Sequence, residues 1–343
     1  MYMEKIRKYP DKTQKLIILS VSVFFFLLAI LVISGTCKNR HLRNAEILVS
    51  DKEKAADSLE VKNNTYTDLS IPTQITKVDD VYFIVDCYHN QIIYNDNLTD
   101  PLNEWKVMTD EMIMGHTLAG DGQVYLVDDT ENERILVFEK AGKSEPKFVL
   151  TKQFTGITGR PHFVEYHEET KTFYVWCSIS GQMYLIKNDG ENVYISDIKE
   201  IPELDGIYVR SFTIIGNDIY FVSGNGSILR ADLDSFRITD RYPVPPEIAG
   251  MVQLTKIDDM YYITVSTDAS WDQDYATIIR CDSLEKLSDH EYEDIYDNFI
   301  GGGTPYYITY FDNAYYMAEH RIPGHSIWRF TVTDGKISPE TVY

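Results

Sequence analysis

The sequence has few cysteines and few basic residues. Its four cysteines, Cys37, Cys87, Cys177 and Cys281, form no Cys-x-x-Cys pair, so a structural zinc site is not expected and the thiols are predicted to be unpaired and mostly buried. Only 32 Lys and Arg stand against 53 Asp and Glu, which gives a formal net charge of -21. Because so acidic a surface repels phosphate backbones, nucleic acid is not expected as a partner.

Several familiar catalytic motifs are also missing. The sequence contains no G-x-S-x-G nucleophile elbow, no H-E-x-x-H zinc motif and no EF-hand loop. The glycine-rich stretch 301–305 lacks the Gly-Lys-Ser/Thr ending of a phosphate loop and is interpreted as a tight turn. Helical periodicity is rare away from the N-terminus, whereas 25 tyrosines and many Val, Ile and Phe residues favour strands.

The N-terminus differs from the rest of the chain. Residues 16–35 carry no charged side chain, and these 20 residues are enough to cross a bilayer as a helix. Five cationic residues precede this run and three follow it within residues 36–43, which predicts a cytoplasmic segment 1–15 and an exported remainder. A cleaved signal peptide is the alternative, but the run is longer than a typical h-region.

The exported part is expected to begin with a linker. Residues 36–71 follow the apolar run and are charged and asparagine-rich over most of their length. From residue 44 to the end, 24 cationic residues stand against 51 acidic ones, a charge near -27. The sequence thus predicts a single-pass protein of the cell membrane, with an acidic body held outside it.

From about residue 72 a unit of strand, polar turn and strand recurs six times. Each unit has a tyrosine at the same place in its second strand, at Tyr82, Tyr125, Tyr174, Tyr220, Tyr262 and Tyr316. Further strand-like stretches follow most units, and four strands per 40–50 residues are typical of a propeller blade. The predicted fold is an all-β six-bladed β-propeller over 72–343, preceded by a single N-terminal transmembrane helix. The outermost strand at the ring closure could come from the C-terminus or from residues 60–70.

Two blades also carry a family resemblance. Residues 85–96 and 127–140 resemble the NHL-type repeat, roughly V-x-D-x-x-N-x-R-I-x-x-F, and Arg134, Ile135 and Phe138 match it in the second blade. Blades three to six lack the Asn-x-Arg-Ile core. The resemblance implies a six-bladed propeller, but it implies no single activity, because that family includes lactonases, amidating lyases and pure binding modules.

Propeller topology predicts where a site would lie. The first strand of each blade lines the central channel and begins on the face that also carries the loops between second and third strands. The residues that this topology gathers there are His89, His116, Arg160, His162, Arg210, Gln253, Trp271, Tyr306, Glu319, His320 and Arg321. The arginines favour an anionic ligand, since guanidinium clamps carboxylate or phosphate. The alternative is that these side chains only bind ordered water in the channel.

Three functions are compatible with these residues. The first is a module that binds a glycan, an anionic small molecule or an envelope protein at the channel mouth. The second is a metal-dependent lactonase or lyase in which His116, His162 and His320 hold a divalent cation. In that enzyme Asp129 or Glu319 would act as base. The third is a scaffold for envelope proteins that uses the sides of the blades, so the sequence leaves open whether the protein is an enzyme.

Overall fold

A computed structural model describes residues 47–49, 52, 60–141 and 147–343. The cytoplasmic segment predicted over 1–15 and the transmembrane helix predicted over 16–35 lie outside these residues. No helix within the described residues is long and apolar enough to cross a membrane.

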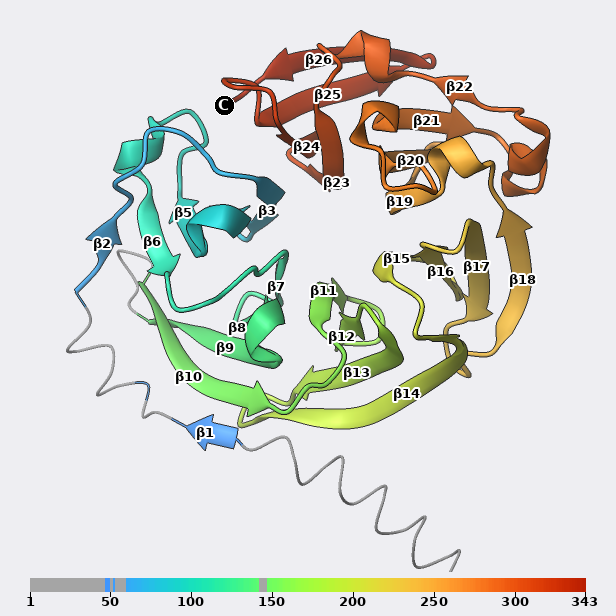
Figure 1. Cartoon of the computed structure of the whole chain (residues 1–343). Coiled ribbons are helices and arrows are strands. Elements are labelled where there is room, and N and C mark those ends of the chain that lie inside the picture. Colours follow the sequence, from blue (N-terminus) through green and yellow to red (C-terminus); the bar gives the residue numbers. More distant parts are fainter. Residues whose placement is uncertain (1–46, 50–51, 53–59, 142–146) are drawn as a thin grey trace, which may run out of the picture. The chain divides into compact units, whose positions relative to one another are not determined.

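Six antiparallel sheets stand around a central channel and form the predicted six-bladed propeller (Figure 1). Blades one to three consist of β3 (Pro72–Val78), β4 (Val81–Asp86), β5 (Gln91–Asn95) and β6 (Lys106–Thr109); β7 (Leu118–Gly120), β8 (Val124–Asp129), β9 (Arg134–Ala141) and β10 (Lys147–Thr155); and β11 (Pro161–His167), β12 (Thr172–Cys177), β13 (Ser180–Asn188) and β14 (Val193–Asp205). In every blade the strands follow the chain from the channel outward.

The second half of the ring repeats this arrangement. Blades four to six consist of β15 (Val209–Ile215), β16 (Asp218–Ser223), β17 (Ser227–Asp232) and β18 (Ile238–Pro243); β19 (Gly250–Ile257), β20 (Met260–Thr267), β21 (Thr277–Cys281) and β22 (Glu293–Asp294); and β23 (Thr304–Phe311), β24 (Ala314–His320), β25 (Ile327–Thr333) and β26 (Lys336–Thr341). Short 3-10 turns join some strands: η1 (Cys87–His89), η2 (Leu102–Glu104), η3 (Thr130–Asn132), η4 (Pro246–Ile248), η5 (Gln273–Tyr275), η6 (Leu284–Asp289) and η7 (Tyr296–Asn298).

Among the strands of the described residues, none is shared between the first and last blades where the ring closes. The C-terminal segment supplies β26, the outermost strand of blade six, as one of the two predicted alternatives had it. The other alternative also holds in part, because β2 (Lys62–Asn63) pairs with β6 as a fifth strand of blade one. A further strand, β1 (Ile47–Val49), pairs with β10 of blade two. Two short strands from the predicted linker are therefore part of the sheets.

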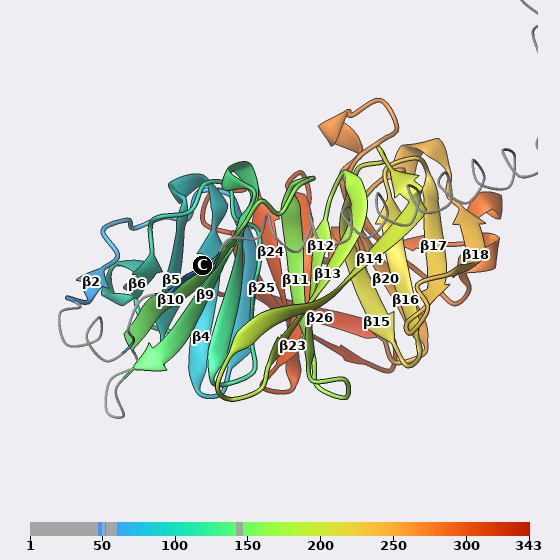
Figure 2. The same ribbon diagram turned by 90° about the horizontal axis from the view of Figure 1, so that it is seen from below.

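Burial follows from the alternation of side chains along each strand. Both faces of a blade carry apolar residues, and each face packs against a neighbouring blade, so the hydrophobic core is divided among the blade interfaces. Cys87, Cys177 and Cys281 are free and buried in this core, as predicted. Cys37 lies outside the described residues. Seen edge-on, the strands cross the thickness of the ring (Figure 2).

A polar side chain bridges every interface between neighbouring first strands. The hydrogen bonds run from Thr73 Oγ1 to His116 O (2.7 Å), from Val164 N to Thr117 Oγ1 (2.8 Å), from His162 Nδ1 to Arg210 O (3.0 Å), from Ser211 Oγ to Val252 O (2.6 Å), from Gln253 Nε2 to Ile308 O (3.2 Å) and from Thr309 Oγ1 to Ile75 O. At the end of β24, His320 Nε2 adds a hydrogen bond to Pro72 O (2.8 Å) between blades six and one. Several polar residues in the first strands therefore link neighbouring blades by hydrogen bonds.

Candidate site at the channel mouth

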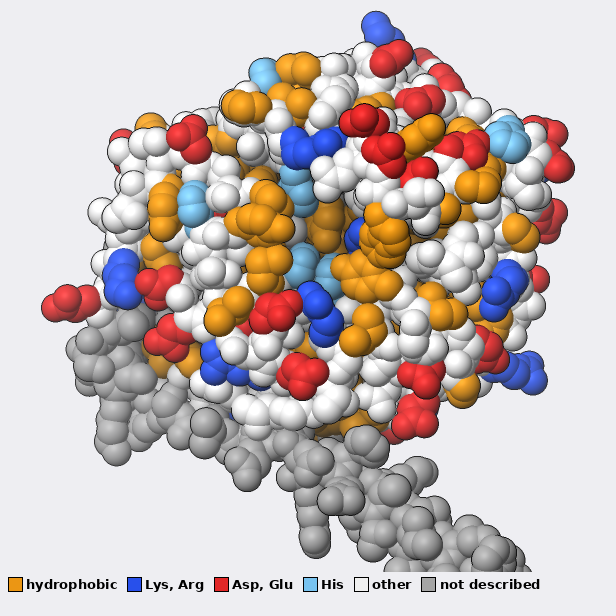
Figure 3. Space-filling view, viewed as in Figure 1, with side chains coloured by type: hydrophobic (Ala, Val, Ile, Leu, Met, Phe, Trp, Pro, Cys, Tyr) orange, Lys and Arg blue, Asp and Glu red, His pale blue; other side chains and the backbone are white. Residues whose placement is uncertain are grey.

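The first strands begin on one face of the ring, which we call the mouth face. The loops between second and third strands, including η1 and η3, lie on the same face, as predicted (Figure 1). Figure 3 shows this face with a hollow at its centre, in which histidine, hydrophobic and basic side chains gather. We call this hollow the mouth.

Four rings form a column along the wall of the mouth. His162 stacks on His116 with 3.8 Å between ring centroids, and Tyr306 lies 6.4 Å from His116 and 4.7 Å from His320. Neighbouring ring planes differ by only 20° to 27°. The rings come from blades two, three and six, so propeller topology brings together four of the residues predicted from the sequence.

His116 is hydrogen-bonded at one ring nitrogen, Nδ1, and not at the other, Nε2, among the described residues. Its ring Nδ1 lies 3.1 Å from Thr130 Oγ1, and Thr130 Oγ1 donates to Asp128 Oδ2 at 3.0 Å. Asp128 is fully buried and also accepts from the backbone N–H of His116 and of Thr117. Among the described residues, none hydrogen-bonds to His116 Nε2. Thr130 therefore fixes the ring through Nδ1, and Nε2 keeps its hydrogen-bonding capacity for a ligand.

The other two histidines of the column are engaged and neutral. His162 donates from Nδ1 to Arg210 O at 3.0 Å and accepts at Nε2 from the hydroxyl of Tyr208 at 3.1 Å. Burial and the neighbouring His116 hold the pKa of His162 well below its usual range. Burial lowers the pKa of His320 to about 3. Both rings are therefore uncharged at neutral pH.

Arg210 faces the mouth with most of its N–H donors free. Its guanidinium carbon lies 4.9 Å from the ring centroid of Tyr208 and 5.8 Å from that of Trp271, and Nη1 donates to Met251 O at 3.2 Å. No carboxylate of the described residues forms an ion pair with it, although the protein is strongly acidic. Cation–π contacts hold the group in place, and most of its N–H donors stay available.

The other two predicted arginines are engaged. Arg160 pairs with Glu131, with 2.7 Å between Nη2 and Oε1. Arg321 donates to the backbone oxygen of Gly303 at 2.7 Å and to the side chain of Gln273 at 3.2 Å. These two arginines fasten loops on the mouth face, so the three predicted arginines do not form a joint cluster.

The two predicted catalytic acids do not reach the mouth. Glu319 is fully buried and accepts hydrogen bonds from the side chains of Tyr296 and Trp328, and burial raises the pKa of this carboxyl. Asp129 is fully buried as well and pairs with Arg134 at 2.6 Å and with Asn132. Both carboxylates stabilise the fold, and Arg134 belongs to the NHL-like pattern.

Two further predicted residues have other contacts. The amide of Gln253 donates to Ile308 O and accepts from Ile308 N at 2.6 Å, which occupies the side chain within the ring. The ring of His89 stacks on Tyr66 at 3.5 Å, and its Nδ1 lies 2.6 Å from Asp86. Neither residue has a contact with the ring column.

The histidines do not fit the predicted metal site. A divalent cation lies in the plane of each imidazole that binds it, at roughly 2 Å from the nitrogen. The rings of His116 and His162 are stacked with a centroid separation of 3.8 Å, so no single ion can bind both in this way. Within the part of the chain that the structure describes, no group of three or more His, Cys, Asp or Glu could hold a metal ion.

Sequence reasoning missed the two tyrosines that complete the mouth. Tyr208 donates to His162 and packs on Arg210, while the hydroxyl of the buried Tyr307 lies 3.2 Å from His162 Nδ1. Tyr208 and Arg210 are two residues apart at the start of β15, a spacing that places side chains on the same face of a strand. The same spacing in the sequence would have predicted that Tyr208 lies at the mouth beside Arg210.

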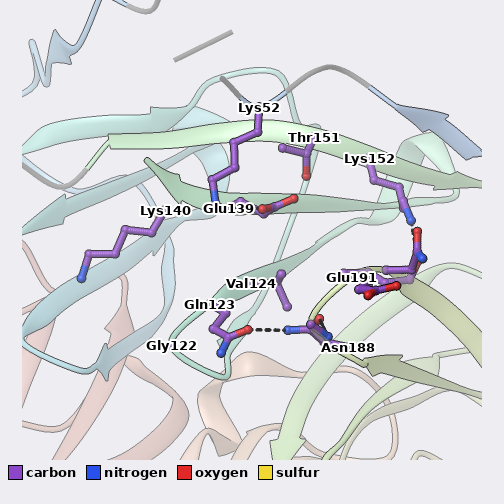
Figure 4. A pocket seen from close by; sticks show the side chains of 13 residues that line it. Lys52, Gly122, Gln123, Val124, Glu139, Lys140, Thr151, Lys152, Asn188 and Glu191 are labelled. Carbon is purple, nitrogen blue, oxygen red and sulfur yellow. Dashed lines mark hydrogen bonds and ion pairs between the residues drawn. The ribbon is translucent and has the colours of Figure 1, made fainter. Parts of the chain in front are cut away.

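A separate cleft of about 480 Å³ opens between the outer parts of blades two and three (Figure 4). Its lysines are already engaged or turned away: Lys52 pairs with Glu139 at 2.9 Å, Lys152 donates to Val193 O at 2.6 Å, and Lys140 points away from the other two. None of the three lysines of this cleft therefore directs a free ammonium group into it, and we do not take it as the candidate site.

Comparisons with known proteins support the fold. No family model and no curated protein matches the chain. Among solved structures, a streptogramin B lyase matches 82% of this chain and 86% of its own with 17% identity and a TM-score of 0.55. Candidate 6-phosphogluconolactonases from Bacteroides fragilis and Bacteroides uniformis match 79% and 76% of this chain, and 83% and 80% of their own. Their identity is 10% each, with TM-scores of 0.56 and 0.52. The chain is similar to these proteins in fold, whereas the NHL-type repeat is not confirmed.

Proposed function

We propose that this protein is a binding module of the cell envelope that takes the anionic group of a ligand at its mouth. The observation that carries the proposal is Arg210, which faces the mouth between Tyr208 and Trp271 without an acidic partner among the described residues. Arg210 is only partly buried and makes a single hydrogen bond, so its guanidinium is accessible and most of its N–H donors are available to an anion.

The surroundings of Arg210 suit a ligand with a carboxylate or phosphate and a flat face. The free N–H groups of the guanidinium would donate to the anion in one plane. Trp271, which is 60% exposed, offers a surface on which a sugar or another ring would stack. His116 Nε2 would accept a hydrogen bond from a hydroxyl group of the ligand. Neutral His162 and His320 add no competing charge.

The test is a binding series on the full-length protein in lipid nanodiscs. Uronic acids and sugar phosphates would be titrated beside their neutral parent sugars, with tryptophan fluorescence as readout, since Trp105 and Trp176 are fully buried and Trp271 is exposed. We expect the anionic compounds to bind, and Arg210→Gln to weaken binding by about 1.5–3 kcal/mol, as expected for a charged hydrogen bond. Arg160→Gln is the matched control and should have little effect. Equal binding by wild type and Arg210→Gln, or a preference for the neutral sugars, would sink the proposal.

A lyase or lactonase activity is the second candidate. It is favoured by His116, whose Nδ1 is oriented by Thr130 and Asp128 while Nε2 is open, the arrangement needed for a group that accepts a proton. The similar propellers named above include a lyase and candidate lactonases. Conversion of an anionic compound in the binding series, lost in His116→Gln, would favour this enzyme. Binding without conversion would favour the module.

We further propose that residues 16–35 anchor the protein and that the propeller lies outside the cell. The proposal rests on the uncharged 20-residue run and on the excess of cationic residues before it. Alkaline carbonate extraction of membranes should leave the full-length protein in the pellet, and protease added outside should digest the propeller. Release into the supernatant would contradict the anchor.

A further inference from the structure

Exposed apolar side chains are concentrated on the mouth face. Nine large apolar residues are exposed in the described part of the chain, and only Tyr194 and Tyr310 lie elsewhere, on β14 and near the end of β23. The remaining seven lie on segments of the mouth face: Tyr66, Tyr88, Ile113, Ile179, Trp271, Tyr275 and Ile300. Figure 3 shows hydrophobic side chains on several sides of the hollow.

Five of these residues come from different places around the ring. Tyr88 belongs to blade one, Ile113 precedes blade two, Ile179 belongs to blade three, Trp271 to blade five, and Ile300 precedes blade six. We call these five residues the apolar rim. Their exposed fractions lie between 41% and 60%. Seven of the nine exposed large apolar residues of the described chain thus share one face, which makes this face the best candidate for contact with another molecule.

The chemistry of the rim favours a protein over a sugar. Carbohydrates stack on aromatic faces, but Ile113, Ile179 and Ile300 are aliphatic and offer no such face. Aliphatic side chains around a polar centre instead exclude water when another protein surface covers them. The sides of the blades have fewer exposed apolar residues in the described part of the chain, which argues against docking there.

The centre of this surface has the composition of an interaction hot spot. Trp271, Tyr208 and Arg210 are in mutual contact, and these three residue types carry most of the binding energy in protein interfaces. Arg210 gives the centre a positive charge, whereas the propeller as a whole is acidic. An acidic group of a partner would thus be attracted at the centre and repelled elsewhere.

We infer that the mouth and its apolar rim dock a protein partner that inserts a loop with an Asp or Glu at its tip. The carboxylate pairs with Arg210, and large apolar side chains next to it on the loop cover the rim. This inference rests on the proposed function, because it assigns the anionic group at the mouth to a protein.

The experiment selects disulfide-closed loop peptides from a displayed library against the full-length protein in nanodiscs. We expect the selected loops to carry Asp or Glu between large apolar residues. Arg210→Gln should weaken the best peptide about tenfold, and so should the double variant Ile113→Ser with Ile179→Ser. Tyr194→Ser, outside the mouth face, is the matched control and should bind the peptide as wild type does. Unchanged unfolding by urea would show that the variants fold.

The outcomes separate this inference from the proposed function. Selected loops without an acidic residue, or peptide binding that ignores both Arg210→Gln and the rim variant, would overturn the inference. Uronic acid binding that depends on Arg210 but not on the rim, with no acidic loop selected, would overturn the inference and leave the proposed function standing. Self-association of the protein that is lost in the rim variant would also overturn it, because a second copy would then be the occupant.

Discussion

Glu165 shows how a single channel residue can set the response of stability to pH. This carboxyl lies on β11, has no hydrogen bond or ion pair with the described residues, and burial raises its pKa to about 8. In the unfolded chain it ionises near its usual value of 4.5. Between these two values the unfolded state has lost the proton and the folded state keeps it. Rising pH therefore lowers the free energy of unfolding over this window.

Replacing the Glu165 carboxyl with a neutral amide should abolish this fall of the free energy of unfolding with rising pH. We expect Glu165→Gln to match wild type near pH 4, where both are uncharged, and to be more stable at pH 8.5 by roughly 3–5 kcal/mol. Urea unfolding at pH 4.5, 6.5 and 8.5 measures the difference, with the exposed Glu169→Gln as the matched control. A Glu165→Gln variant no more stable than wild type at pH 8.5 would refute this account.

The arginines show what sequence can and cannot decide about single residues. Topology alone predicted Arg160, Arg210 and Arg321 on one face, and the structure has them in or beside β11, β15 and β24 at its mouth face. Their pairing was not predictable, because Arg160 and Arg321 take left-handed backbone conformations, with φ of 61° and 72°, in loops that bring them to Glu131 and Gly303. Arg210, at the regular start of β15, makes a single hydrogen bond and keeps most of its N–H donors available, whereas Arg321 spends its donors on Gly303 and Gln273.

At the scale of elements, the sequence predicted the strands that carry the repeated tyrosine. Each of these strands buries apolar residues on both faces, so its pattern is strong. The outermost strands are harder to predict. One of the strand-like stretches that follow the repeated units, residues 292–300 of blade five, forms only β22, and the carboxylate of Asp294 accepts from Tyr296 N at 2.9 Å where η7 begins. β1 was missed, and β2 was foreseen only as one of two alternatives for an outer strand, because two or three residues of a charged segment carry no alternation.

At the scale of the whole molecule, one contact that joins the two ends of the ring lies outside the repeat pattern. Tyr343, the last residue, follows β26 of blade six and reaches blade one. Its hydroxyl accepts from the indole N–H of the fully buried Trp105 at 3.0 Å and donates to the backbone oxygen of Asp100 at 2.7 Å. No strand of the described residues is shared between blades one and six. This contact and the hydrogen bonds from Thr309 and His320 to the backbone of β3 therefore join the ends of the ring.

Removing only the hydroxyl isolates this contribution. Tyr343→Phe keeps the aromatic ring, which packs edge-on against Trp105 with 6.0 Å between centroids. It removes the hydroxyl that accepts from Trp105 and donates to Asp100 O, and it leaves that oxygen only the 3.2 Å hydrogen bond from the Trp105 indole. We expect the free energy of unfolding in urea to fall by about 1–2 kcal/mol. Hydrogen exchange should accelerate first in β3 and β23, the first strands of the two blades that the contact joins. Tyr194→Phe, on the exposed edge of β14, should change neither quantity. A Tyr343→Phe protein as stable as wild type would mean that packing between β3 and β23 closes the ring without the C-terminal hydroxyl.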